Sequence, residues 1–228
     1  MPARFLPLLA SLSLLPATLL ATDPDEAWLE DDSEFRALEV NEGELRFIDR
    51  PAGKPVHHHH NTIELSASSL EDGWVGLLQC HENLDAVRRA QVVYNEDRSR
   101  GLEVTEVENI GRAWVDGASV QLEDVGPDAR LCVRAETRAL VANGDGSYTL
   151  RNGPFMRRFL DGYYPMRVSM DIRLPERQLR FAGIQPPRQE GFDVTSSTQG
   201  VEINAWFEGR LQTEVRFDSC KRAGPSTC

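Results

Sequence analysis

Hydrophobic and polar residues alternate over most of the chain beyond residue 44. The clearest segment is residues 166–174, where every second position is apolar. A period of two is typical of a β-strand with one buried and one solvated face. The same pattern covers residues 201–207 and 211–217. Because the Glu208-Gly209 step lies between these two runs, they are predicted to form a hairpin.

Shorter strand-like runs fill the rest of the chain. They cover residues 62–66, 74–80, 87–94, 102–107, 113–115, 120–122, 131–135, 140–141, 147–150 and 178–184. Turn-forming residues separate them about every 8–12 positions, a spacing typical of a sandwich or barrel. Helical patterns are scarce, with one short turn predicted at residues 154–160, where Pro154 suits a first helical position. The predicted fold is an all-β, antiparallel β-sandwich with few short helices.

The domain organisation allows two interpretations. Asn152-Gly153-Pro154 is the best boundary if the chain forms two small immunoglobulin-like modules, at residues 45–152 and 153–219. One large sandwich, in which the second segment continues the first, fits as well. In both cases residues 220–228 form a C-terminal tail.

The N-terminus has the parts of a secretory signal peptide. Arg4 precedes an apolar stretch at residues 5–20, and the small residue Ala21 follows it. We therefore predict a signal peptide at residues 1–21 and a periplasmic or secreted protein. An uncleaved anchor is the alternative, although about 16 apolar residues is short for a membrane span of roughly 20. After cleavage, no integral membrane segment is expected.

Charge and cysteines add to this prediction. Residues 22–44 hold ten acidic residues and one basic residue, which favours a flexible acidic arm. The net charge of −11 argues against nucleic acid as a partner. The four cysteines of an exported chain predict two disulfides. Of the three possible pairings, Cys80–Cys132 and Cys220–Cys228 are preferred, because the second closes a short loop with a Gly-Pro turn.

All five histidines lie within 25 residues: His57, His58, His59, His60 and His81. In an extended tract, His57 and His59 share one face and His58 and His60 the other. Imidazoles bind Zn²⁺, Cu²⁺ or Ni²⁺, and His81 is placed to complete a site after folding. The alternatives are adventitious metal binding and a solvent-facing strand edge.

Two further patterns bear on function. The chain lacks a G-x-S-x-G elbow, and His81-Glu82 is not followed by the second histidine of H-E-x-x-H. A Tyr-Tyr-Pro segment with nearby arginines is the candidate contact for an anionic or aromatic partner. Its residues are Arg157, Arg158, Tyr163, Tyr164 and Arg167.

The sequence thus predicts a non-catalytic, exported binding or assembly protein of the bacterial cell envelope. Its partner would be a protein or another envelope component. The alternative function is periplasmic binding or delivery of a transition metal through the histidine tract. An uncharacterised hydrolase is kept as a residual alternative.

Overall fold

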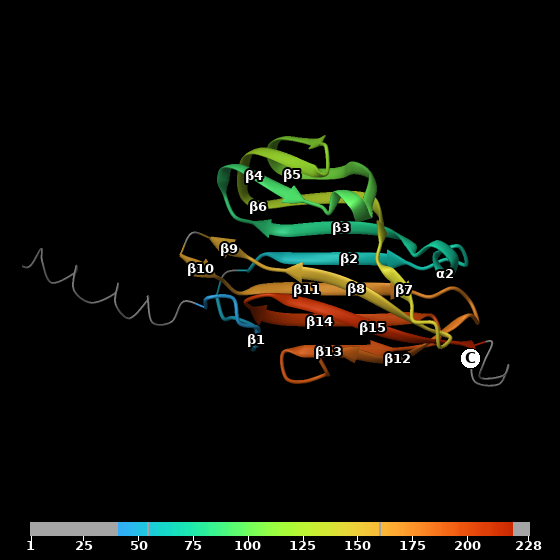
Figure 1. Cartoon of the computed structure of the whole chain (residues 1–228). Coiled ribbons are helices and arrows are strands. Elements are labelled where there is room, and N and C mark those ends of the chain that lie inside the picture. The colour runs from blue at the N-terminus through green and yellow to red at the C-terminus, as the bar shows by residue number, and fades with distance from the viewer. Residues whose placement is uncertain (1–40, 54, 160, 221–228) are drawn as a thin grey trace, which may run out of the picture. The chain divides into compact units, whose positions relative to one another are not determined.

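The computed structural model describes residues 41–53, 55–159 and 161–220 of the chain (Figure 1). Strands make up 68% of the structure and helices 4%, which confirms the all-β class. The predicted signal peptide, the acidic arm up to residue 40 and Cys228 lie outside the described residues.

Nine of the described strands form the larger sheet, in the order β1-β14-β11-β2-β3-β6-β4, with β13 also beside β14 and β5 beside β6. Their bounds are β1 (Arg46–Phe47), β2 (His58–Glu64), β3 (Trp74–Leu84), β4 (Val87–Val93), β5 (Ser99–Asp116), β6 (Ser119–Arg138), β11 (Met166–Arg173), β13 (Phe192–Ser196) and β14 (Gly200–Glu208). The pair β2 and β11 runs parallel, so the prediction of a purely antiparallel fold is wrong at this point. The immunoglobulin-like detail is not confirmed.

Two smaller sheets complete the strand inventory of the described residues. The order β12-β15-β8-β7 joins Leu179–Gln185, Leu211–Ser219, Ser147–Phe155 and Leu140–Ala142, while β9 (Arg158–Phe159) pairs with β10 (Gly162–Tyr163). The helical elements bounded within the described residues are α2 (Ser69–Asp72) and the 3₁₀ turn η1 (Glu96–Arg98). The helical turn predicted near Pro154 is wrong, because β8 continues to Phe155 and β9 starts soon after.

Both larger sheets combine strands from early and late parts of the chain. In one, β2 and β3 lie beside β11 and β14, and in the other β7 and β8 lie beside β15 and β12. The segment Asn152-Gly153-Pro154 lies within β8. The described residues between 41 and 220 group as one compact unit.

The predicted hairpin of residues 201–217 is wrong. β14 belongs to the larger sheet and β15 to the four-stranded one, so the Glu208-Gly209 turn carries the chain between sheets. Both strands bury their alternating apolar residues in the same cluster. They can do so because they lie in two sheets that face each other across the core, whereas a flat hairpin would leave one face of both strands without a covering layer. Gly209 has φ +85°, and a Cβ at this position would overlap the Glu44 carbonyl oxygen.

The core has two parts. The larger apolar cluster contains residues of both main sheets, including Ile63 and Ile203 on one side and Leu150 and Val215 on the other. A smaller cluster lies within the β4–β5–β6 region, around Leu122. There β4 pairs with the first part of β6 and β3 with its last part, on the same side. β5 pairs with β6 over most of the length of β6.

The three long strands bend at shared positions. Positive φ angles occur at Asn83 of β3, Asn109 of β5, and Asp124 and Asp128 of β6. Register shifts accompany the first two, between His81 and Leu84 and after Glu108. Asn and Asp tolerate this conformation better than other non-glycine residues, and bulges bend strands, so these residues fold the β4–β6 region over the sheet.

The predicted disulfide between Cys80 and Cys132 is confirmed. The two residues face each other on β3 and β6, with a Cα–Cα distance of 4.1 Å. Cys220 is buried, while its predicted partner Cys228 lies outside the described residues. The second disulfide therefore stays a prediction.

We predict that Gly209→Ala destabilises the fold by at least about 3 kcal/mol, because backbone must move to admit the new methyl group. Gly144→Ala is the matched control. Gly144 has a similar φ of +80°, but a Cβ there meets no described atom within 4 Å. The control should therefore cost about 1 kcal/mol, the conformational penalty alone. Urea unfolding measures both, and equal losses would contradict the role given to the turn.

Candidate functional site

The histidine tract enters the centre of the larger sheet. His58, His59 and His60 are the first residues of β2, which is paired on one side with β11 and on the other with β3. The predicted alternation is confirmed. His59 is buried toward the interior with Asn61, whereas His58 and His60 lie on the opposite face of the sheet with Ser169.

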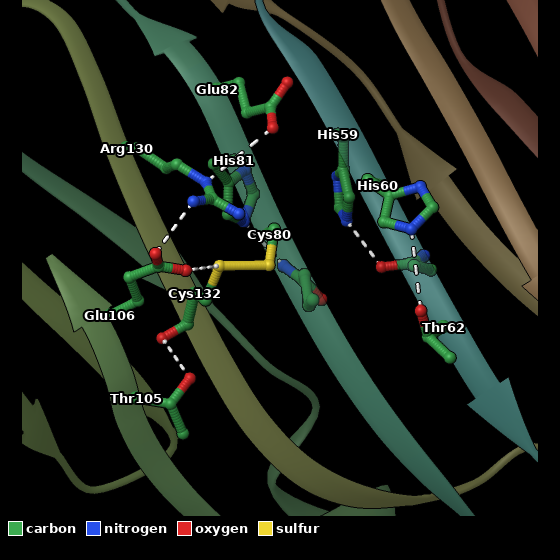
Figure 2. The surroundings of a disulfide bond; sticks show 12 residues. His59, His60, Thr62, Cys80, His81, Glu82, Thr105, Glu106, Arg130 and Cys132 are labelled. Atoms are coloured by element: carbon green, nitrogen blue, oxygen red, sulfur yellow. Dashed lines mark hydrogen bonds and ion pairs between the residues drawn. A yellow bond between two sulfur atoms is a disulfide. The ribbon is translucent and has the colours of Figure 1, made fainter. Parts of the chain in front are cut away.

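Three histidines gather on the inner face. His57 Nε2 lies 3.0 Å from His81 Nδ1, and the rings of His59 and His81 have centroids 4.4 Å apart. Polar neighbours contact the Nε2 atoms of two of these rings: Asn61 Oδ1 is 3.0 Å from His59 Nε2, and the Gln79 amide is 2.7 Å from His81 Nε2. Figure 2 shows His59 and His81 on adjacent strands. His81 therefore lies against two histidines of the tract.

Burial keeps these rings neutral at pH 7. It lowers the pKa of His57 to about 4, although Asp85 opposes the shift, and it lowers the pKa of His59 to about 3. The pKa of His81 is well below its usual value for the same reason. A neutral imidazole offers one donor and one acceptor, and its bare nitrogen can bind a metal.

These histidines line a cavity of about 980 Å³ that is open to solvent, since exposed residues such as Val93 also line it. Its walls come from β2, β3, β4, β8 and β15, with polar residues that include Gln79, Tyr94 and Asn152. The Tyr94 hydroxyl and Asn152 Nδ2 are buried and have no hydrogen-bond partner among the described residues. Burial raises the pKa of Tyr94, so its hydroxyl stays protonated as a donor. The wall of the cavity thus contains two unsatisfied donors, which a ligand reaches only when these side chains turn toward it.

The outer face carries a separate cluster. Ser169 Oγ lies 2.7 Å from His58 Nε2 and 2.7 Å from His60 Nδ1. A carboxylate lies behind each ring, with Glu82 3.1 Å from His58 Nδ1 and Asp171 3.4 Å from His60 Nε2. The sheet lies between this cluster and the cavity, so the four tract histidines do not act as one ligand set.

The predicted metal ligands are therefore divided between two places. Within the described part of the chain, no group of three His, Cys, Asp or Glu side chains is arranged to hold a metal ion. The closest approach is the pair His57 and His81, which supplies two nitrogens to the cavity. The disulfide takes Cys80 out of the set of thiolate ligands.

The predicted partner-contact residues are also divided. The Arg157 guanidinium makes a two-pronged ion pair with Asp85, at 3.0 and 2.6 Å, and lies 5.6 Å from the Tyr164 ring centroid. Arg158 lies 5.6 Å from the Tyr163 ring centroid. Arg167 instead donates from Nε to Asn204 at 2.8 Å, on the larger sheet. β9, β10 and the residues directly beside them thus gather two arginine–tyrosine pairs without Arg167.

Sequence reasoning missed several residues of these sites. Asn61 and Gln79 are polar residues at inward positions of strands, and that misplaced polarity was the available signal. Tyr94, just after β4, and Asn152 of β8 reach the cavity only through the tertiary fold. Ser169 gave no signal, since polar residues are expected on the outer face of β11.

Comparisons with protein-family models, curated proteins and solved structures found no match. The fold and the site together define the class as an all-β protein with a histidine-lined open cavity. Among the described residues, no helix has the length and apolar character needed to cross a membrane.

The buried histidines predict a pH-dependent stability. The unfolded chain takes up protons below pH 6.5, whereas the buried rings resist protonation until pH falls to about 4 or 3. Their stabilising contribution is therefore complete above pH 6.5 and is lost as the pH falls below that value, by up to about 1.4 kcal/mol per pH unit for each histidine.

The measurement is the free energy of urea unfolding at pH values between about 7 and about 5. His59→Leu removes one of the buried rings, so the slope against pH should become shallower, whatever constant cost the variant carries. A slope identical to that of the parent would show that His59 does not contribute to this dependence.

Proposed function

We propose that this chain is an exported binding protein of the bacterial cell envelope, and that its ligand occupies the histidine-lined cavity. One observation carries the proposal: the Tyr94 hydroxyl and Asn152 Nδ2 are buried without partners in residues that line the cavity. An unsatisfied buried polar group costs about 1–3 kcal/mol, so a ligand toward which these side chains turn gains affinity by accepting their hydrogen bonds. The volume of about 980 Å³ is within the range of small-molecule sites.

The lining also favours a class of ligand. Tyr94 and Asn152 offer hydrogen-bond donors, and the neutral histidines offer both donors and acceptors. Arg98 and Arg138 add positive charge, while Leu77 and Phe155 supply apolar contacts. A small polar molecule with acceptor oxygens and one apolar face fits this lining best.

Export is part of the proposal. The signal-peptide pattern of residues 1–21 supports it, and so does the Cys80–Cys132 disulfide, because disulfides persist in oxidising compartments. The packing of both main sheets on one apolar cluster supports a β-sandwich as the scaffold.

The cavity proposal predicts capture of a small molecule that a cavity-filling variant cannot hold. The purified protein would be incubated with a low-molecular-weight bacterial envelope extract and examined by native mass spectrometry. Ala90→Trp places a bulky ring at a lining residue and should abolish the adduct. Ala52→Trp, at an exposed loop position outside the lining, should keep it. An adduct of equal abundance in both variants, or none in the parent, would contradict the proposal.

Metal binding is the second candidate, and the 3.0 Å separation of His57 Nε2 and His81 Nδ1 favours it. Two nitrogens that share one tetrahedral ion at about 2.0–2.1 Å each lie about 3.3 Å apart, so the pair needs only a small opening and the loss of its shared hydrogen bond. Both rings are neutral at pH 7, as ligation requires. Cu²⁺, Zn²⁺ or Ni²⁺ would then take its remaining ligands from solvent or from a delivered molecule.

Calorimetric titration of the protein with each of these ions distinguishes this candidate from adventitious binding. A physiological inner site predicts one tight site that is lost in His57→Ala and in His81→Ala. His60→Ala, on the opposite face of the sheet, is the control and should keep it. Weak binding of several ions, or loss of binding only in the control, would reject the inner site.

A further inference from the structure

On the outer face of the larger sheet, a serine, a histidine and a carboxylate form a hydrogen-bonded series. Ser169 Oγ lies 2.7 Å from His58 Nε2, and His58 Nδ1 lies 3.1 Å from Glu82 Oε2. The three residues come from β11, β2 and β3, which are neighbours in the sheet. A nucleophile within reach of a base, with the base oriented by a third group, is the geometric signature of nucleophilic catalysis.

The hydrogen-bond network assigns the protons. With Glu82 at Nδ1, the His58 Nδ1–H donates to the carboxylate, so the bare Nε2 accepts the Ser169 hydroxyl proton. His60 Nδ1 lies equally close to Ser169 Oγ, and its Nε2 faces the Asp171 carboxylate at 3.4 Å and the Thr62 hydroxyl at 3.5 Å. Glu82 is closer to His58, at 3.1 Å, than Asp171 is to His60, so we assign His58 as the base and His60 as the residue that holds the serine in place.

Further residues fix the carboxylate. Glu82 Oε1 is 3.7 Å from Arg130 Nε, and Arg130 Nη1 donates to Glu106 at 2.8 Å. Figure 2 shows this chain of charges beside the Cys80–Cys132 disulfide, which joins β3 to β6. The His58 side chain is only 14% exposed. Burial lowers its pKa, although Glu82 opposes the shift, so the ring is neutral and can accept a proton.

We propose that Ser169 and His58 form the catalytic pair of an ester-hydrolysing site, with Glu82 as the positioning residue. Ser169 Oγ bonds to the acyl carbon of a carboxylic ester while its proton passes to His58 Nε2. The ester C–O bond then breaks, and His58 returns the proton to the departing alkoxide, which leaves as an alcohol. A water molecule attacks the acyl-serine in the same way and releases a carboxylic acid, which restores Ser169.

Side chains must stabilise the oxyanion of this reaction, because the backbone N–H groups of β11 are engaged in the sheet. Asn204 lies opposite Ser169 on β14, and its Oδ1 accepts from Arg167, which leaves Nδ2 as the amide donor. Arg167 adds positive charge close enough to lower the pKa of His58. These two side chains are the candidate oxyanion donors.

The surroundings restrict the substrate. Ser169, His58 and Asn204 line a depression of about 380 Å³ that also contains Asp193 and Glu202. These carboxylates repel anionic esters, so a neutral ester with a small acyl group is the expected class. The site lies on the opposite face of the sheet from the cavity, so it is independent of the ligand proposed there.

The test is covalent labelling of the full chain with a fluorophosphonate. Ser169 Oγ displaces fluoride from phosphorus, so an O–P bond forms as the P–F bond breaks and the proton passes to His58. Intact mass should show one label, and tandem mass spectrometry of the parent should place it on Ser169. His58→Ala should lower the labelling rate at least about 100-fold, whereas His60→Ala should lower it less than about 10-fold.

Glu82 has its own readout. Glu82→Gln should slow labelling without a change in melting temperature, and Glu82→Asp should recover part of the rate because it keeps the acceptor. Hydrolysis of p-nitrophenyl acetate should be lost in Ser169→Ala. Absence of label from the parent, a label on another residue, or full hydrolysis by Ser169→Ala would overturn the proposal.

Discussion

The position of β2 in the middle of the larger sheet is the constraint on which both candidate sites depend. Hydrogen bonding to β11 on one side and β3 on the other fixes its register at every residue from His58 to Glu64. A shift of one residue would exchange its two faces, placing His58 and His60 in the core. Ile63, which is fully buried at the far end of the same strand, opposes that exchange. Burial of Ile63 at the far end of β2 therefore determines which face of the sheet each histidine occupies.

Burial of the inner histidines must be offset by their partners. Desolvation lowers the pKa of His57, His59 and His81, so the protein holds them as neutral rings and avoids the greater cost of buried charge. Asn61 and Gln79 satisfy two of the ring nitrogens. Only Tyr94 and Asn152 of the cavity lining keep buried atoms without a partner in the described residues, which makes them the distinctive polar feature of the cavity.

Period-two patterning predicted the all-β class and most strands, because alternation reports burial directly. It could not predict which strands pair, since β14 and β15 present the same alternation whether they form a hairpin or face each other across a core. It also split β5 and β6 into shorter runs, because the bends at Asn109, Asp124 and Asp128 interrupt the alternation. The separation of His57 and His59 from His58 and His60 followed from local geometry. The serine at position 169 reaches His58 across 111 residues of sequence, and no local pattern carries that contact.

The two candidate sites use adjacent residues of the same two strands. His58 and Glu82 face outward, while their chain neighbours His57, His59 and His81 face the cavity. Deleting or loosening either strand would damage both sites and would show nothing about either. Single substitutions at alternate positions separate them, because each side chain enters only one face of the sheet.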